Sequence, residues 1–260
     1  MNASELFKAG KLSGAIAAQV QEVKAHPTDH GRHLFLFELL AFSGDLERAR
    51  KQIEAIHYDE MVLESARLAY RQLLDAEQSR RRVIHDGIMP QFLVPPPEHL
   101  YKRLEAINCL RADKQAEASA LLMQAEEEAP PLKGTLNGRT FEGLRDCDDL
   151  FGPVLEVMAH GDYFWLPVEQ VESLSAKPPK SPRDLLWLPA KLSVREGPAG
   201  DVFLPVLYPG SHEHAEELVK IGRATDWKQL DGGPVRGAGA RTFLVGDEGV
   251  NLLEWRDLCL

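Results

Sequence analysis

Apolar residues in the first half of the chain recur at the three- and four-residue spacing of an α-helix. The clearest cases are LFLFELLAF (residues 34–42) and the set Leu63, Ala66, Tyr70 and Leu73. This spacing gives each helix one apolar stripe that can be buried. The pattern predicts helices over about 3–9, 13–25, 31–43, 46–56, 60–84, 98–111 and 115–128.

One proline-rich run interrupts the helical pattern. The run is DGIMPQFLVPPPEH, at residues 86–99. Proline lacks an amide donor and restricts the residue before it, so a continuous helix cannot pass through. An extended connector is therefore expected over residues 86–97.

Beyond Pro130-Pro131 the apolar period shortens to two, and β-branched and aromatic residues become frequent. Asn137-Gly138 is the strongest local signal for a two-residue β-hairpin, and Gly161-Asp162 predicts a second turn. Short helices are expected at about 211–222 and 224–230. The second half is therefore predicted to be mostly β.

Together these patterns predict a multidomain protein of α and β structure. Residues 1–133 are expected to form α-α helical hairpins. Residues 134–260 are expected to form a separate β-rich (α+β) domain.

A recurring interval suggests that the hairpins are repeats. A turn residue precedes a small alanine by five positions in three places, and two of the turn residues are 34 residues apart. The pairs are Gly10 and Ala15, Gly44 and Ala49, and Asp113 and Ala118. Glycine or aspartate suits a left-handed turn, and a small residue lets two helices cross closely. The spacing is typical of tetratricopeptide-like repeats, although an ordinary helical domain remains the alternative.

Repeats of this kind present a concave groove to a peptide or an amphipathic helix. The expected groove residues come from the first helix of the second and third copies. They are Leu34, Glu38, Phe42, Leu100, Arg103, Ile107 and Leu110. Equally, these side chains could simply pack against the C-terminal domain.

Composition and charge argue against several classes of function. The net charge of −10 disfavours nucleic-acid binding, which needs a basic face. The basic run Arg80-Arg81-Arg82 is interpreted as solvating a helix end. No apolar run is long enough for a membrane span or a signal peptide. Three widely spaced cysteines form neither a disulfide framework nor a zinc pattern, so we expect a cytoplasmic protein.

Two candidate sites for chemistry involve histidines and acids. His212 and His214 form the most metal-like pair, but a metal needs three or four converging ligands. The alternative is a polar loop that opens a helix. Asp146, Asp148 and Asp149 could act in acid–base catalysis, although three neighbouring acids are more typical of a solvated turn or helix cap.

The remaining candidates are glycine-rich or carry a lone serine. Gly232-Gly233 and the segment 237–239, flanked by arginines at 236 and 241, could cradle a phosphate. A strand-like segment follows where a helix is needed, so a β-turn is favoured. Ser211 lacks the second glycine of an esterase motif. The sequence therefore assigns no catalytic residue, metal or cofactor.

Several strings together resemble one known family. They are FKAGKLSGAIAAQVQEVKAHPTD, FLFELLAFSGDLERARKQ, TLNGRTFEGLRDCDDLFGPVLEV, VFLPVLYPGSHEH and TFLVGDEGVNLLEW. In this order, from near residue 4 to near residue 257, they resemble the ImpE/SciE-type (TagJ-like) accessory proteins of the bacterial type VI secretion system. Cys147 stands where a small residue is expected.

The resemblance implies a cytosolic, non-enzymatic adaptor with a tetratricopeptide-like N-terminal region and a separate C-terminal domain. It implies binding to an N-terminal amphipathic helix of the small subunit of the contractile sheath. Sheath recycling by the system's unfoldase ATPase is the associated process. A metal-dependent or hydrolytic C-terminal domain that uses His212 and His214 is the alternative hypothesis.

Overall fold

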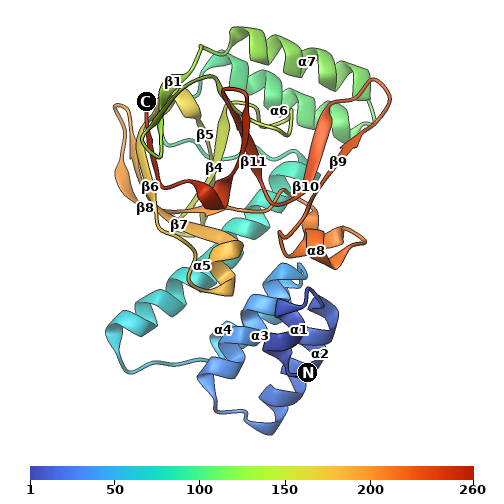
Figure 1. The fold of residues 1–260 in the computed structure, drawn as a ribbon, viewed down its shortest axis with the longest axis vertical. Coiled ribbons are helices and arrows are strands. Elements are labelled where there is room, and N and C mark those ends of the chain that lie inside the picture. The colour runs from blue at the N-terminus through green and yellow to red at the C-terminus, as the bar shows by residue number, and fades with distance from the viewer.

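The computed structural model describes residues 1–260 and places seven helices before the first strand (Figure 1). They are α1 (Ala3–Lys8), α2 (Leu12–Ala25), α3 (His30–Phe42), α4 (Leu46–Glu54), α5 (Met61–Asp86), α6 (Glu98–Arg111) and α7 (Gln115–Glu128). All seven agree with the predicted helices to within about two residues. None is long and apolar enough to cross a membrane.

Three helix pairs, α1/α2, α3/α4 and α6/α7, are joined by turns of the same kind. Each turn residue has a positive φ, and the alanine five positions later is fully buried. The turn residues are Gly10, Gly44 and Asp113, and the alanines are Ala15, Ala49 and Ala118. A left-handed residue ends one helix, and the absence of a larger side chain lets the next helix pack closely. The prediction of left-handed turns followed by close helix contacts is confirmed.

The second half contains thirteen strands. They are β1 (Lys133–Leu136), β2 (Arg139–Glu142), β3 (Leu144–Asp146), β4 (Val154–Ala159), β5 (Asp162–Pro167), β6 (Val171–Ala176), β7 (Trp187–Val194), β8 (Ala199–Pro205), β9 (Thr225–Gln229), β10 (Val235–Gly239), β11 (Thr242–Val245), β12 (Glu248–Asn251) and β13 (Asp257–Cys259). Eight of them form an antiparallel sheet in the order β2-β1-β13-β6-β7-β8-β4-β5. The α+β class, helical first and β-rich second, is confirmed.

Two smaller sheets complete this half. One has the order β12-β11-β3, and the other pairs β9 with β10. The hairpin at Asn137-Gly138 forms as predicted, with positive φ at both residues. The helix predicted near residues 224–230 is wrong, because Thr225–Gln229 is strand β9 and pairs along its whole length with β10. Short 3-10 turns and the one-turn helix α8 (Glu217–Lys220) lie in the connections.

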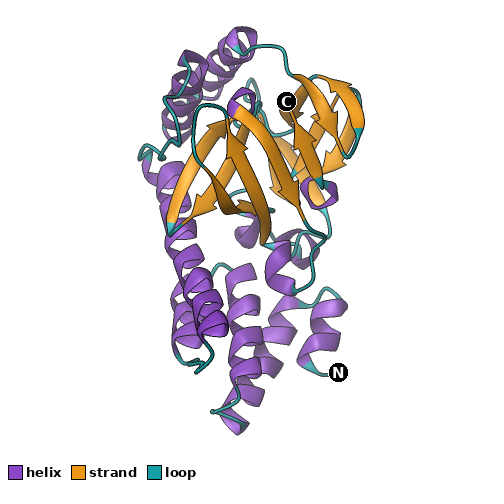
Figure 2. Cartoon of the chain, turned by 90° about the vertical axis from the view of Figure 1, so that its left-hand side faces the viewer, coloured by secondary structure: helices purple, strands orange, loops and turns teal.

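Helix α5 joins the two halves. It starts beside α4, runs diagonally across the molecule and packs against β4 and β5 (Figures 1 and 2). Its buried residues Leu74, Ala76 and Val83 belong to one hydrophobic cluster with residues of both the helices and the sheet. Phe37 of α3 also stacks on Trp187 of β7, with ring centroids 6.3 Å apart. The hydrophobic core is thus continuous across residue 133.

Candidate functional site: a buried ion-pair network and the surfaces around it

The most unusual interior feature is a set of ion pairs between α5 and the β-rich half. Arg80 of α5 donates to both carboxylate oxygens of Glu156 on β4, from Nε at 2.7 Å and from Nη2 at 2.8 Å. Arg241 also pairs with Glu156, and its Nη1 donates to Oδ2 of Asp146 at 2.8 Å. All four side chains are buried. We call this set the buried ion-pair network.

Aromatic side chains enclose the network and donate to it. Tyr208 Oη donates to Asp146 Oδ1 at 2.7 Å, and Tyr163 Oη donates to Glu156. Trp165 Nε1 in turn donates to Tyr163 Oη at 2.6 Å. The Arg241 guanidinium lies 4.4 Å from the centroid of the Phe151 ring. Buried charges require this density of partners, because an unpaired charge in the interior is strongly destabilising.

The acidic run near residue 146 is therefore interior, which corrects the expectation of a solvated turn. Asp148 is fully buried and accepts from Arg236 Nε at 2.9 Å and from the Gly237 amide at 2.9 Å. Asp149 is half-buried and accepts from Arg145 and from the Val235 amide. The expectation that Arg80 solvates a helix end is likewise wrong.

The glycine-rich segment 237–239 serves these contacts, and the arginines on either side of it, Arg236 and Arg241, are paired with buried carboxylates. Gly237 lies in strand β10, and a Cβ at this position would collide with the ring of Tyr208. Gly239 donates its amide to Ser211 Oγ at 2.8 Å, and Ser211 Oγ donates to the Tyr208 carbonyl at 2.6 Å. Ser211 is thus buried and engaged with the backbone, which is unsuited to a nucleophile.

Burial shifts the pKa values of Asp146 and Arg241 in the directions that favour their uncharged forms. It raises the pKa of Asp146 to about 6, although Arg241 opposes the shift, and it lowers the pKa of Arg241 to about 10. At neutral pH both groups remain charged and paired. Burial also raises the pKa of Tyr163 and of Tyr208 above the usual range, so both phenols stay protonated donors.

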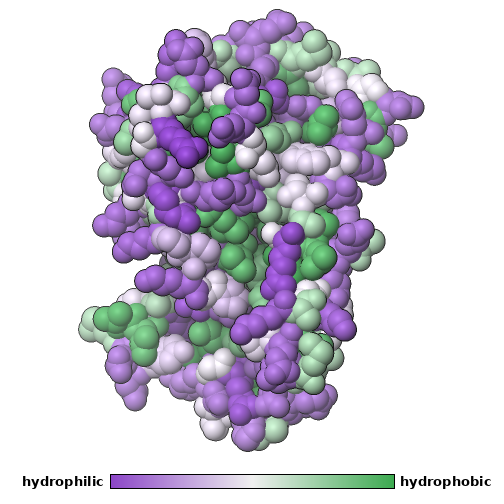
Figure 3. Space-filling view, viewed as in Figure 1, coloured by the Kyte–Doolittle hydropathy of each residue, from purple (hydrophilic) through white to green (hydrophobic).

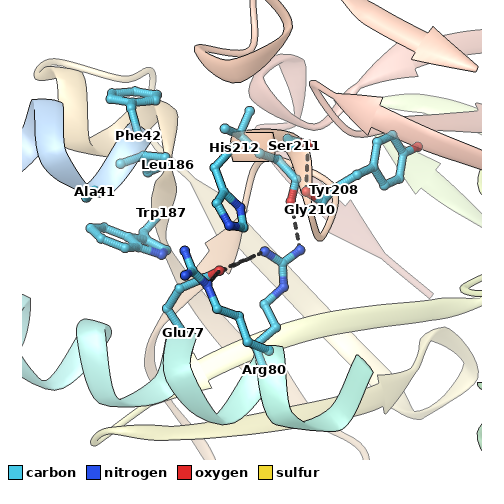
Figure 4. A pocket seen from close by; sticks show the side chains of 12 residues that line it. Ala41, Phe42, Glu77, Arg80, Leu186, Trp187, Tyr208, Gly210, Ser211 and His212 are labelled. Carbon is cyan, nitrogen blue, oxygen red and sulfur yellow. Dashed lines mark hydrogen bonds and ion pairs between the residues drawn. The ribbon is translucent and has the colours of Figure 1, made fainter. Parts of the chain in front are cut away.

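A cavity beside the network is too small for a substrate. It measures about 30 Å³ and is lined by Phe42, Arg80, Trp187, Tyr208 and His212, among others (Figure 4). That volume suits a single water molecule. The side chains in Figure 4 come from α3, α5, β7 and the segment after β8, so the cavity marks the junction where the helices meet the sheet. The geometry supports a structural junction between the helices and the sheet.

The two histidines do not converge. His214 Nε2 lies 3.1 Å from Asp226 Oδ2, and its Nδ1 accepts from the Glu216 amide at 3.1 Å. His212 instead lies against Gly44 in the α3–α4 turn, and burial, followed by Arg81, lowers its pKa. No group of three His, Cys, Asp or Glu side chains is arranged as metal ligands. The geometry therefore gives no support to the metal hypothesis.

The seven predicted groove residues do not form one open surface. They belong to α3 and α6, which lie at opposite ends of the molecule (Figure 1). Five are buried, namely Glu38, Phe42, Leu100, Arg103 and Ile107, whereas Leu34 and Leu110 are partly exposed.

The charged members of this set are paired with other residues of the chain. Glu38 accepts from Arg183 Nη1 at 2.7 Å, and Arg183 lies over the Tyr70 ring. Arg103 donates to Glu126 at 2.7 Å and to the Asp149 carbonyl at 2.9 Å. In this conformation these side chains pack on the rest of the chain, as the alternative interpretation expected.

Exposed apolar residues gather instead at the start of α5. Met61 and Val62 are 83% and 80% exposed, and Leu63 and Leu68 are each 43% exposed. Figure 3 shows an apolar patch on a protruding part of the surface, at the place where α5 begins in Figure 1. We call these four residues the α5 patch. Sequence reasoning assigned Leu63 to a buried stripe, because periodicity shows which residues share a face but not what covers that face.

Comparison with known proteins gives the family. The sequence profile described as "ImpE protein" matches residues 138–259. The chain is 36% identical to the type VI secretion system accessory component TagJ of Pseudomonas aeruginosa over 99% of this chain and 90% of that protein. The crystal structure of protein VPA1032 from Vibrio parahaemolyticus superposes with a TM-score of 0.89 at 24% identity, over 99% of this chain and 96% of that one. This chain therefore belongs to the ImpE family of type VI secretion system accessory components.

Proposed function

We propose that this protein is a cytosolic, non-enzymatic adaptor of the type VI secretion system. In this proposal it binds an amphipathic N-terminal helix of the sheath small subunit and so modulates sheath assembly or recycling. The observation that carries the proposal is the 36% identity to an accessory component along nearly the whole chain. Any influence on the sheath-recycling unfoldase ATPase is indirect and acts through the sheath.

The arrangement of the helices supports a tetratricopeptide-like description of residues 1–133, followed by a β-rich domain over 134–260. Left-handed turn residues and buried alanines recur in three helix pairs. Such hairpins commonly bind helices or peptides of other proteins.

We assign the binding surface to the α5 patch, because most of the residues expected in the groove are buried. Large exposed apolar side chains that gather on one protrusion are typical of protein–protein contact sites. An amphipathic helix could cover Val62 and Leu68 with its apolar face. Leu34 is the residue that best tests the original groove on α3, because it retains exposed surface.

The test is a titration of the full-length protein with a synthetic peptide of the sheath small subunit's N-terminal helix. Val62→Asp combined with Leu68→Asp should weaken binding about tenfold or more, because two apolar contacts are lost. Gln78→Glu is the matched control, since it adds a charge to an exposed position of the same helix, several turns away from the α5 patch, without removing an apolar side chain. Circular dichroism should show an unchanged helix content in all variants.

The outcomes distinguish the α5 patch from the α3 surface that contains Leu34. Loss of binding in Leu34→Asp with normal binding in the α5 double variant would return the site to α3. Saturable binding that neither variant weakens would exclude both surfaces. No binding of the peptide by the wild-type protein would contradict the proposed partner.

A further inference from the structure

Two strands end their sheets without a neighbour on the outer side. Strand β2 is the last strand of the eight-stranded sheet, and β12 is the last strand of the three-stranded sheet. A terminal strand presents unpaired amide and carbonyl groups to its surroundings. An extended peptide can use such groups as a template and add a strand.

The register shows which backbone groups of β2 face outward. Leu136 and Arg139 close a two-residue hairpin, and the Gly143 amide donates to the Leu132 carbonyl at 2.8 Å. Hydrogen-bonded pairs alternate with non-bonded pairs along an antiparallel ladder. The amides and carbonyls of Thr140 and Glu142 consequently point away from β1.

The same alternation applies to β12. Val245 and Glu248 close the β11–β12 hairpin, and the Leu252 amide donates to the Arg241 carbonyl at 3.0 Å. The backbone of Gly249 therefore points away from β11. A glycine within a strand often marks a place where another backbone approaches closely. Here a Cβ would touch only Thr242, at 3.8 Å, so local packing does not require the glycine.

The largest groove described in the molecule lies between these two hairpins. Its volume is about 740 Å³, and it is lined on one side by residues 136–142 and on the other by residues 245–250. Four carboxylates line it, from Glu142, Asp247, Glu248 and Glu254, against the single guanidinium of Arg139. Lys133 pairs with Glu142 at 2.8 Å on the exposed surface, where such a pair is weak. The groove is therefore acidic.

We propose that this groove binds an extended basic segment of a partner protein, which adds as a strand to the free edge of β2. The outward amides and carbonyls of Thr140 and Glu142 supply main-chain hydrogen bonds. Alternate side chains of the segment face the carboxylates of Asp247 and Glu248, so lysine or arginine is favoured there. The site is separate from the α5 patch and does not depend on the proposed sheath contact.

The probe is a fluorescein-labelled peptide of alternating lysine and valine, titrated into the full-length protein by fluorescence anisotropy. Saturable binding is expected at low salt, with affinity that falls as salt is added. A peptide with glutamate in place of lysine should not bind. A lysine–valine peptide with every backbone amide N-methylated should also fail, because neither of its edges can complete the ladder.

Two pairs of variants locate the site. Thr140→Pro removes an outward amide without removing a hydrogen bond to β1, and it should weaken binding about fivefold or more, the effect of one lost hydrogen bond or greater. Thr140→Val keeps that amide and should bind normally. Asp247→Asn combined with Glu248→Gln should weaken binding about fivefold. Glu105→Gln combined with Glu127→Gln removes two exposed charges elsewhere and should have no effect.

Hydrogen exchange gives a readout that is independent of affinity. Binding should slow amide exchange in residues 139–142. Absence of saturable binding, equal binding by the N-methylated peptide, or protection only elsewhere would each overturn the proposal. A concentration-dependent dimer in sedimentation velocity that Thr140→Pro abolishes would also overturn it, because a second copy would then occupy the edge.

Discussion

Two glycines with almost the same backbone conformation have different surroundings. Gly44 has a φ of +78° and Gly138 a φ of +77°. A Cβ on Gly44 would overlap the His212 ring, whereas one on Gly138 would meet nothing within 4 Å. A substitution at Gly138 therefore measures left-handed strain alone, and one at Gly44 adds a collision between the α3–α4 turn and the segment after β8.

We expect Gly138→Ala to lower the free energy of unfolding by about 1 kcal/mol through left-handed strain. Gly44→Ala should lower it by about 2–4 kcal/mol, because overpacking adds to that strain. Urea denaturation of both variants checks the difference. Equal losses would mean that the His212 ring moves aside without cost.

Residues whose environment depends on nearby sequence were predictable, and those that depend on distant partners were not. Gly10, Gly44 and Asp113 each stand at the boundary of two helical patterns, which is a local signal. Arg80 and Asp146 looked like solvated charges, because their partners Glu156 and Arg241 lie 76 and 95 residues away in the chain. The strings that carried the family resemblance already contained Glu156 and Tyr208, but resemblance alone did not show that they meet.

At the scale of elements, one buried carboxylate, that of Glu38, adds an ion pair to the apolar contacts between α3 and the β-rich half. Burial raises the pKa of Glu38 from 4.5 to about 6, although its partner Arg183 opposes the shift. Between these pH values the folded state binds more protons than the unfolded state. The stability contributed by Glu38 is therefore complete below pH 4.5 and decreases as the pH rises through 6.

We predict that the difference in free energy of unfolding between wild type and Glu38→Gln changes with pH in that direction. The wild type should lose about 2 kcal/mol relative to the variant between pH 4.5 and pH 7. Urea titrations of both proteins at several pH values measure this difference. A constant difference, or one that favours the wild type as the pH rises, would contradict the assignment.

The elements themselves were predicted unevenly for a physical reason. The helices follow from a stripe repeated over several turns, and their limits were set by glycine and proline. Strand β9 is short and mostly exposed, so its own residues scarcely favour one state, and its conformation depends on pairing with β10. The groove between β2 and β12 could not be foreseen, because it depends on which strands end each sheet.

At the scale of the molecule, the continuous core predicts joint unfolding of helices and sheet. All four tryptophans, at positions 165, 187, 227 and 255, lie in the β-rich half, whereas most helical residues lie before residue 130. Tryptophan fluorescence and circular dichroism at 222 nm thus report on different halves. Their urea transitions should coincide, as expected for one cooperative unit. Separate midpoints would show that the helical half and the β-rich half unfold independently.

The buried ion-pair network also has a consequence for reading relatives of this protein. Two of the five strings that carry the family resemblance contain the segments RDCDDLFGPVLEV and VLYPGSHEH, which supply Asp146, Glu156 and Tyr208 to the interior. These three side chains are buried, so they hold the interior of the fold together and are not available to a partner. The α5 patch lies outside every string that carries the resemblance, whereas the acidic groove, at residues 136–142 and 245–250, lies inside two of them. The exposed apolar surface on α5 can therefore change among proteins that share this scaffold, and the partner it binds can change with it.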